Sequence, residues 1–148
     1  RKGCYMSIIL QALMATLAST AEDPAPTVTI NNGLVSDFQV GTNSTASITF
    51  NSNGTVSSVG NSGTYTTDWI DPTSAAPDDY EIIAVPSSGS VSSGTVNQWL
   101  PLTSNRTWSK TQSSIGQGSV IIDFKIRKGS GPELDSGTIT LRAEKETF

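Results

Sequence analysis

The chain has no histidine and a single cysteine, Cys4. Histidine is the commonest general base and metal ligand near neutral pH, and Ser-His-Asp and Cys-His arrangements cannot be built without it. One cysteine can form neither an intrachain disulfide nor a cysteine-based zinc site. We therefore predict a protein that is not an enzyme and that has no catalytic residues, no metal and no cofactor.

Charged residues are also scarce. They make up 15% of the 148 residues, against about 25% in an average protein, and the net charge is −4. Nucleic-acid binding needs clustered lysine or arginine to neutralise phosphates. The only basic run consists of Lys125, Arg127 and Lys128, whose spacing is typical of one face of a strand. We predict no nucleic-acid partner.

Acidic residues gather around the predicted turn at residues 69–72, and they are Asp68, Asp71, Asp78 and Asp79. Calcium favours oxygen ligands from such loops, but this spacing is not the alternating pattern of a known calcium loop. Nothing in the sequence marks the raised pKa that one member of a glycosidase carboxylate pair needs. Turns recruit aspartate for hydrogen bonds to its own backbone, and we interpret these residues as turn formers.

Long apolar runs are missing too. A membrane-spanning helix needs about 18 apolar residues, and the main apolar stretch, Tyr5–Leu17, is shorter, so we predict no membrane span. Read as a helix, it places one stripe of apolar residues three and four positions apart: Met6, Ile9, Leu10, Leu13, Met14 and Leu17. So short a helix is marginal in water unless its stripe is buried. We predict a docking helix over residues 1–21 whose stripe is buried on its own domain or, as we favour, on another chain.

The same segment has a second interpretation. Arg1 and Lys2, the apolar stretch and the small residues 19–21 have the outline of a secretory signal peptide. The protein would then be a secreted bacterial surface protein whose mature chain starts near Glu22. Met6 could also be the natural start, with residues 1–5 preceding it.

Beyond the N-terminal segment, the apolar period changes from helical to two. Pro24 and Pro26 make residues 22–26 a linker, because proline ends a helix and favours an extended backbone. Residues 27–148 then form one all-β domain. Strands are predicted at 28–30, 35–40, 46–50, 55–59, 63–69, 80–85, 106–109, 119–128 and 137–144. About eight or nine short strands punctuated by turn residues are typical of a sandwich or barrel, and their edges would offer strand-addition surfaces to neighbours.

The three tryptophans suggest an alternative function for the protein. Trp108 lies in an alternating run and is predicted to be in the core. Trp69 and Trp99 border turns, so we expect them to be partly exposed, where they could stack on a sugar ring. A carbohydrate-binding adhesion module for host-surface glycans is therefore an alternative function, with Trp69 and Trp99 as the glycan contacts.

A series of landmarks runs in a recognisable order over roughly two thirds of the chain. Its members are Ala46–Phe50, Asn53-Gly54, Gly63–Trp69, Pro72, Tyr80–Ile82, Ser88-Gly89, Trp99–Leu102, Arg106–Trp108, Val120–Arg127 and Gly137–Leu141. As a set they resemble small Ig-like β-sandwich proteins found among the structural genes of tailed bacteriophages. The resemblance implies an Ig-like antiparallel sandwich located in the virion, with no catalytic residues to transfer. Other virion proteins and copies of itself would be its partners, in the tail, neck or head decoration, reached through the N-terminal helix.

Overall fold

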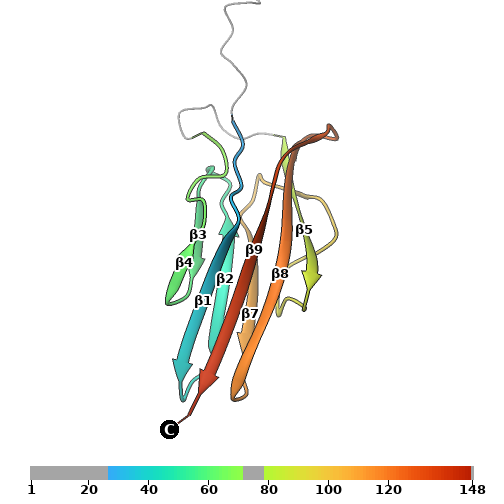
Figure 1. Cartoon of the computed structure of the whole chain (residues 1–148). Helices are drawn as coiled ribbons and strands as arrows, with labels where there is room; N and C mark the ends of the chain where they lie inside the picture. Colours follow the sequence, from blue (N-terminus) through green and yellow to red (C-terminus); the bar gives the residue numbers. More distant parts are fainter. Residues whose placement is uncertain (1–26, 72–78, 148) are drawn as a thin grey trace, which may run out of the picture.

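Every regular element in the part of the chain that the structure describes is a β-strand. The structure is a computed structural model, and it describes residues 27–71 and 79–147 (Figure 1). The strands are β1 (Gly33–Val40), β2 (Ser44–Phe50), β3 (Val56–Val59), β4 (Ser62–Thr64), β5 (Tyr80–Ser88), β6 (Leu100–Pro101), β7 (Arg106–Gln112), β8 (Gly116–Lys128) and β9 (Glu133–Glu146). The prediction of an all-β domain is confirmed. The predicted helix at residues 1–21 and the linker at 22–26 lie outside the described residues.

The strands form two sheets. The larger has six strands in the order β4-β1-β9-β8-β5-β6, and the smaller has three in the order β3-β2-β7. The prediction of a purely antiparallel sandwich is wrong at one pair, because β1 runs parallel to β9 from Gly33↔Ile139 to Val40↔Glu146. After β1 the chain crosses to the smaller sheet, so β1 lies beside the last strand and not beside β2. The alternation of side chains is the same in parallel and antiparallel strands, so the sequence could not indicate that β1 and β9 are parallel.

The core lies between the two sheets. Phe124 of β8 contacts Phe50 of β2 and Trp108 of β7, with ring centroids 5.0 Å away in both cases. The inward-facing residues of β8 are fully buried, and they are Val120, Ile122, Phe124 and Ile126. The alternation predicted for this strand is therefore confirmed. Aromatic contacts of this kind add about 0.5–1.5 kcal/mol each beyond the burial of their area.

The connections follow the turn chemistry of the sequence in part. Residues 51–54 form the predicted hairpin turn between β2 and β3, in which the Asn51 backbone N–H donates to the Thr55 carbonyl at 2.8 Å. Of the strand predicted at 63–69, only residues 63 and 64 are in a strand, β4. Beyond Thr64 the chain crosses to the other sheet, where the Trp69 N–H donates to the Gly54 carbonyl at 2.9 Å. The two-residue β6 was not predicted, because it is too short to alternate.

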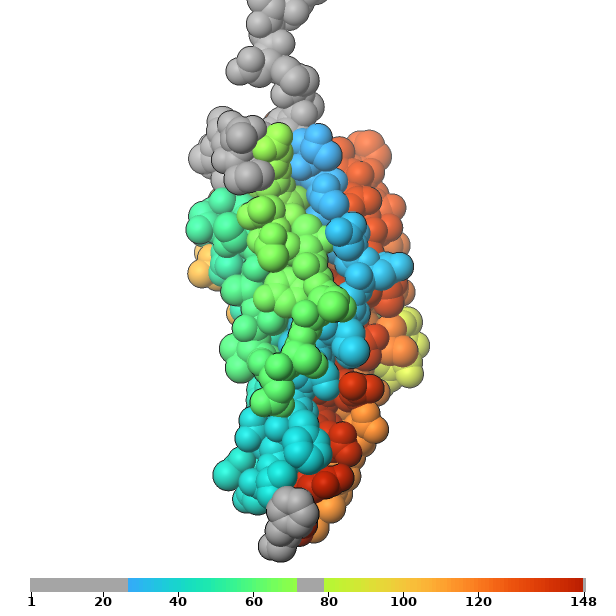
Figure 2. All heavy atoms as spheres, turned by 60° about the vertical axis from the view of Figure 1, so that its left-hand side comes forward, coloured from blue at the N-terminus to red at the C-terminus, as the bar shows by residue number. Residues whose placement is uncertain are grey.

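Along both edges of the sandwich, chain segments cover the junction between the two sheets. On the side that Figure 2 brings forward, β3 pairs with the smaller sheet and β4 with the larger, so this stretch covers the junction (green in Figure 2). On the other side, Ser93 bridges to Ser109 of β7, and the Asn97 N–H donates to the Ala84 carbonyl of β5 at 2.7 Å. Short edge strands and covering segments disfavour strand addition by a neighbour, contrary to the expectation from the sequence.

A buried carboxylate fixes the crossing between the sheets. Asp37 of β1 is only 6% exposed. It accepts hydrogen bonds from the Ser44 hydroxyl at 2.8 Å and from the Thr45 N–H at 2.9 Å, both on β2. The Gln39 amide donates to its other oxygen at 3.1 Å. Asp37 therefore ties the start of the smaller sheet to the larger one.

We expect Asp37→Ala to lower the free energy of unfolding by about 1–3 kcal/mol, because the Thr45 N–H and the Gln39 amide lose their acceptor and the buried Ser44 hydroxyl keeps only the backbone carbonyl of residue 37. Asp123→Ala is the control. Asp123 accepts one bond, from the Thr138 hydroxyl at 2.7 Å, and is half-buried, so its loss should be smaller. Urea unfolding followed by circular dichroism measures both. Equal losses would show that Asp37 does not hold the crossing.

Candidate functional site

The predicted docking residues lie outside the described residues. This applies to the whole stripe of Met6, Ile9, Leu10, Leu13, Met14 and Leu17. What the structure does place is the point where their segment joins the domain, at Thr27, at one end of an elongated body (Figure 1).

That joint is firmly held. The Asp71 N–H donates to the Thr27 carbonyl and the Thr29 N–H donates to the Trp69 carbonyl, both at 3.0 Å. The Ile30 N–H donates to the Asp135 carboxylate at 2.6 Å, and the Ile30 side chain is buried. The described chain is therefore bonded to the folded domain from Thr27 onward.

The two tryptophans proposed as glycan contacts, Trp69 and Trp99, differ in their exposure to solvent. Trp69 is fully buried, so the expectation that it is partly exposed is wrong. Its ring packs edge-on against Tyr80 with centroids 5.6 Å apart, and its indole N–H donates to the Asn51 carbonyl at 2.7 Å. The turn that it borders folds back over the end of the core, where Val28 bridges to Ile70. Trp69 is therefore a core residue in this structure and offers no face to a sugar.

Trp108 is fully buried, as predicted. Its indole N–H donates to the Thr95 carbonyl at 2.7 Å. Among the three tryptophans, Trp99 alone keeps an intermediate exposure. The carbohydrate hypothesis therefore depends on Trp99 alone.

Trp99 is already engaged on one face of its ring. The Arg127 guanidinium carbon lies 4.0 Å from the ring centroid, a cation–π arrangement. The Arg127 Nε also forms an ion pair with the Glu81 carboxylate at 2.9 Å, and both side chains are about three-quarters buried, at 24% exposure. Arginine and glutamate meet because β5 and β8 pair Glu81 directly with Arg127. The basic run noted in the sequence is thus partly neutralised from the neighbouring strand.

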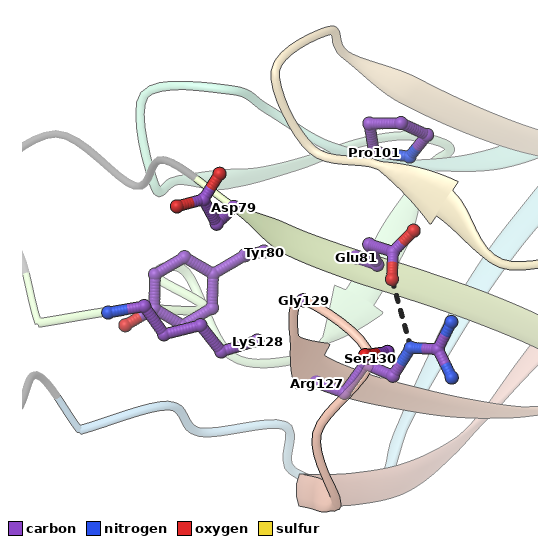
Figure 3. A pocket seen from close by; sticks show the side chains of 8 residues that line it. All are labelled: Asp79, Tyr80, Glu81, Pro101, Arg127, Lys128, Gly129 and Ser130. Carbon is purple, nitrogen blue, oxygen red and sulfur yellow. Dashed lines mark hydrogen bonds and ion pairs between the residues drawn. The ribbon is translucent and has the colours of Figure 1, made fainter.

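An open hollow of about 620 Å³ lies beside this ion pair (Figure 3). Its lining residues come from β5 and the residue before it, from β6, and from β8 and the turn after it: Asp79, Tyr80, Glu81, Pro101, Arg127, Lys128, Gly129 and Ser130. The Lys128 ammonium lies 5.7 Å from the centre of the Tyr80 ring. Two carboxylates and two cations balance, so the hollow suits a polar group without net charge better than a phosphate.

Across residues 27–71 and 79–147, no three Asp, Glu or Cys side chains lie close enough together to hold a metal ion. Within those ranges there is also no helix long and apolar enough to span a membrane.

Comparison with known proteins identified no similar protein. A scan against protein-family models, a search of curated proteins and a search of solved structures each gave no match. The resemblance of the landmark series to phage sandwich proteins stays a prediction.

Proposed function

We propose that this protein is a non-enzymatic structural or accessory component of a tailed-phage virion, in the tail, neck or head decoration. Its two-sheet domain is of the Ig-like type and supplies shape, while residues 1–21 dock it on neighbouring subunits. The observation that carries the proposal is the joint at Thr27. The first described residues, which follow the apolar segment and the linker in the sequence, lie at one end of an elongated domain, where backbone bonds hold Thr27 and Thr29 to the turn at Trp69–Asp71.

The landmark series supports the Ig-like assignment. Its members coincide with the framework of the two sheets: Ala46–Phe50 lies in β2, Arg106–Trp108 in β7, Val120–Arg127 in β8 and Gly137–Leu141 in β9. A tryptophan buried between two sheets is a hallmark of Ig-type sandwiches, and Trp108 occupies such a place. The covered sheet edges of the domain suit a component that stands beside other copies without strand pairing.

A pair of variants in the full chain tests the docking role. Leu10→Asp with Leu13→Asp places two charges on the predicted apolar stripe, and Ala15→Asp with Ser19→Asp places them on the opposite face. Particles assembled with each variant are purified, and its copy number is measured by quantitative mass spectrometry. We expect the stripe variant to fall by about tenfold or more, because a buried apolar contact does not accept a charge, and the control to stay near the wild-type level.

Two results would contradict the proposal. One is incorporation of the stripe variant at the wild-type copy number. The other is a native chain that begins near Glu22, found by mass spectrometry of the protein from its source, because that would identify residues 1–21 as a removed signal peptide.

A further inference from the structure

The end of the domain opposite Thr27 carries exposed apolar side chains. Phe38 is 43% exposed, Val40 40% and Ile115 66%. Phe38 and Val40 lie on the last residues of β1, and Ile115 directly precedes β8. The strands β1 and β9 finish together at this end, while the described chain starts at the other (Figure 1). We call the surface made by Phe38, Val40 and Ile115 the tip.

The tip is a fixed surface. The Lys145 ammonium donates to the Asn43 side-chain oxygen at 3.4 Å and to the Ser113 carbonyl at 3.0 Å, which joins the loop after β1 to the loop before β8. The Gly41 N–H donates to the Glu146 carbonyl at 2.6 Å. These bonds hold the loops that carry the apolar side chains. Exposure of these side chains to water is unfavourable, and a partner that covers the tip would remove it.

Carboxylates accompany the apolar side chains of the tip. The parallel register pairs Phe38 with Glu144 and Val40 with Glu146, so both carboxylates lie on the outer face of the larger sheet beside them. Two cations of β9 lie near them: Arg142, whose guanidinium lies within 3.4 Å of the Ser36 hydroxyl farther up the strand, and Lys145, whose ammonium is bonded to Asn43 and Ser113. Glu144 and Glu146 together with Lys145 leave one negative charge at the tip, so a partner that fits it carries an apolar stripe and positive charge.

Residues 1–21 have this chemistry. Arg1 and Lys2 precede the apolar stripe that ends at Leu17. Opposite charge at the rim steers such a contact and fixes its direction. The residues of the linker, 22–26, span at most about 18 Å, which is less than the length of β1 alone, about 26 Å. To contact the tip of its own domain the segment would have to run back along the whole of β1, whereas a second copy can present its tip to the segment directly.

We infer that the tip of one copy receives residues 1–21 of a second copy, so that copies join head to tail. This inference rests on the proposed docking role of residues 1–21 and names the surface that they dock on. Because the donor segment and the receiving tip are different surfaces at opposite ends, the contact is heterologous, and its repetition gives a row or a ring of copies.

Full-length variants test this in solution. The tip variant carries Phe38→Asp and Val40→Asp, and the segment variant carries Leu10→Asp and Leu13→Asp. The control is Leu134→Asp, which changes a 49% exposed leucine at the start of β9, away from the tip. We expect wild type and control to associate with rising concentration in sedimentation equilibrium. The tip and segment variants should associate at least about tenfold more weakly than wild type, and their circular dichroism should be unchanged.

Mixing the two defective variants is the decisive step. The tip variant keeps an intact segment and the segment variant keeps an intact tip, so the mixture should form a one-to-one dimer that neither forms alone. Absence of that dimer, or wild-type association of the tip variant, would overturn the inference. If the tip variant nevertheless enters particles fully while the segment variant does not, residues 1–21 dock on a different virion protein. The proposed function would then stand without the head-to-tail contact.

Discussion

Replacing Trp108 with alanine is expected to lower the free energy of unfolding by about 3–5 kcal/mol, among the largest effects of any single change in the domain. The ring is fully buried and lies against Phe124 and Phe50, with centroids 5.0 and 6.2 Å away. It joins the smaller sheet to the larger one. Its removal leaves a cavity between the sheets and removes the donor that the Thr95 carbonyl uses.

Trp99→Ala is the matched control for this prediction. It removes the same side chain from a half-buried position, where the cation–π contact with Arg127 is worth about 0.5–1 kcal/mol. We expect a loss well below that of Trp108→Ala. Urea unfolding followed by circular dichroism gives both values from the midpoints, provided that the slope is unchanged. Equal midpoints for the two variants would show that Trp108 does not join the sheets.

Gly94→Ala is expected to cost about 2–4 kcal/mol, because two penalties combine. Gly94 has a φ of +113°, which side-chain-bearing residues rarely adopt. A methyl group there would lie 2.5 Å from a ring carbon of Trp108 and 2.8 Å from the Thr107 carbonyl. The segment that covers β7 would have to move off the buried indole.

Gly41→Ala separates the two penalties. Gly41 also has a positive φ, +76°, but a methyl group there meets nothing within 4 Å. Its cost should be the conformational one alone, about 1–2 kcal/mol. The difference between the midpoints of the two variants in urea reports the contact with Trp108. If Gly94→Ala is no more destabilising than Gly41→Ala, the close packing of this segment on the ring is not real.

Alternation identified the strands that are buried on one face. In β8, apolar residues occupy every second position from Val120 to Ile126, the positions between them are polar except for Ile121, and the structure has a strand over that whole stretch. Period-two patterns are reliable where one face is buried and the other is wet. For the same reason Trp108, which lies in such a run, could be predicted as core.

Long-range pairing was not predictable from local pattern. Trp69 was expected at the surface because it borders a turn, yet hydrogen bonds from Thr29 and to Gly54 draw that turn over the core. The ion pair of Glu81 with Arg127 depends on the register of β5 with β8, which a single sequence does not state. The candidate hollow and the tip both arise from such pairings, so neither could be named beforehand.

The tip illustrates this point for the proposed contact. In the sequence, Phe38 and Val40 are ordinary members of an alternating strand, and Ile115 is an isolated apolar residue in a loop. Only the parallel pairing of β1 with β9 brings Glu144 and Glu146 beside Phe38 and Val40. The apolar stripe of residues 1–21 stays a prediction from spacing, whereas the tip that we propose to receive it could be named only from the structure.

We propose that the apolar stripe of residues 1–21 is buried on another polypeptide chain. A photoreactive phenylalanine analogue in place of Leu13, in the full chain, tests this most directly when it is activated in assembled particles and the cross-linked peptides are sequenced. We predict cross-links to a different chain, and to the peptide containing Phe38 and Val40 if that chain is a second copy. Cross-links confined to the same polypeptide, in a protein that sediments as a monomer, would contradict the claim.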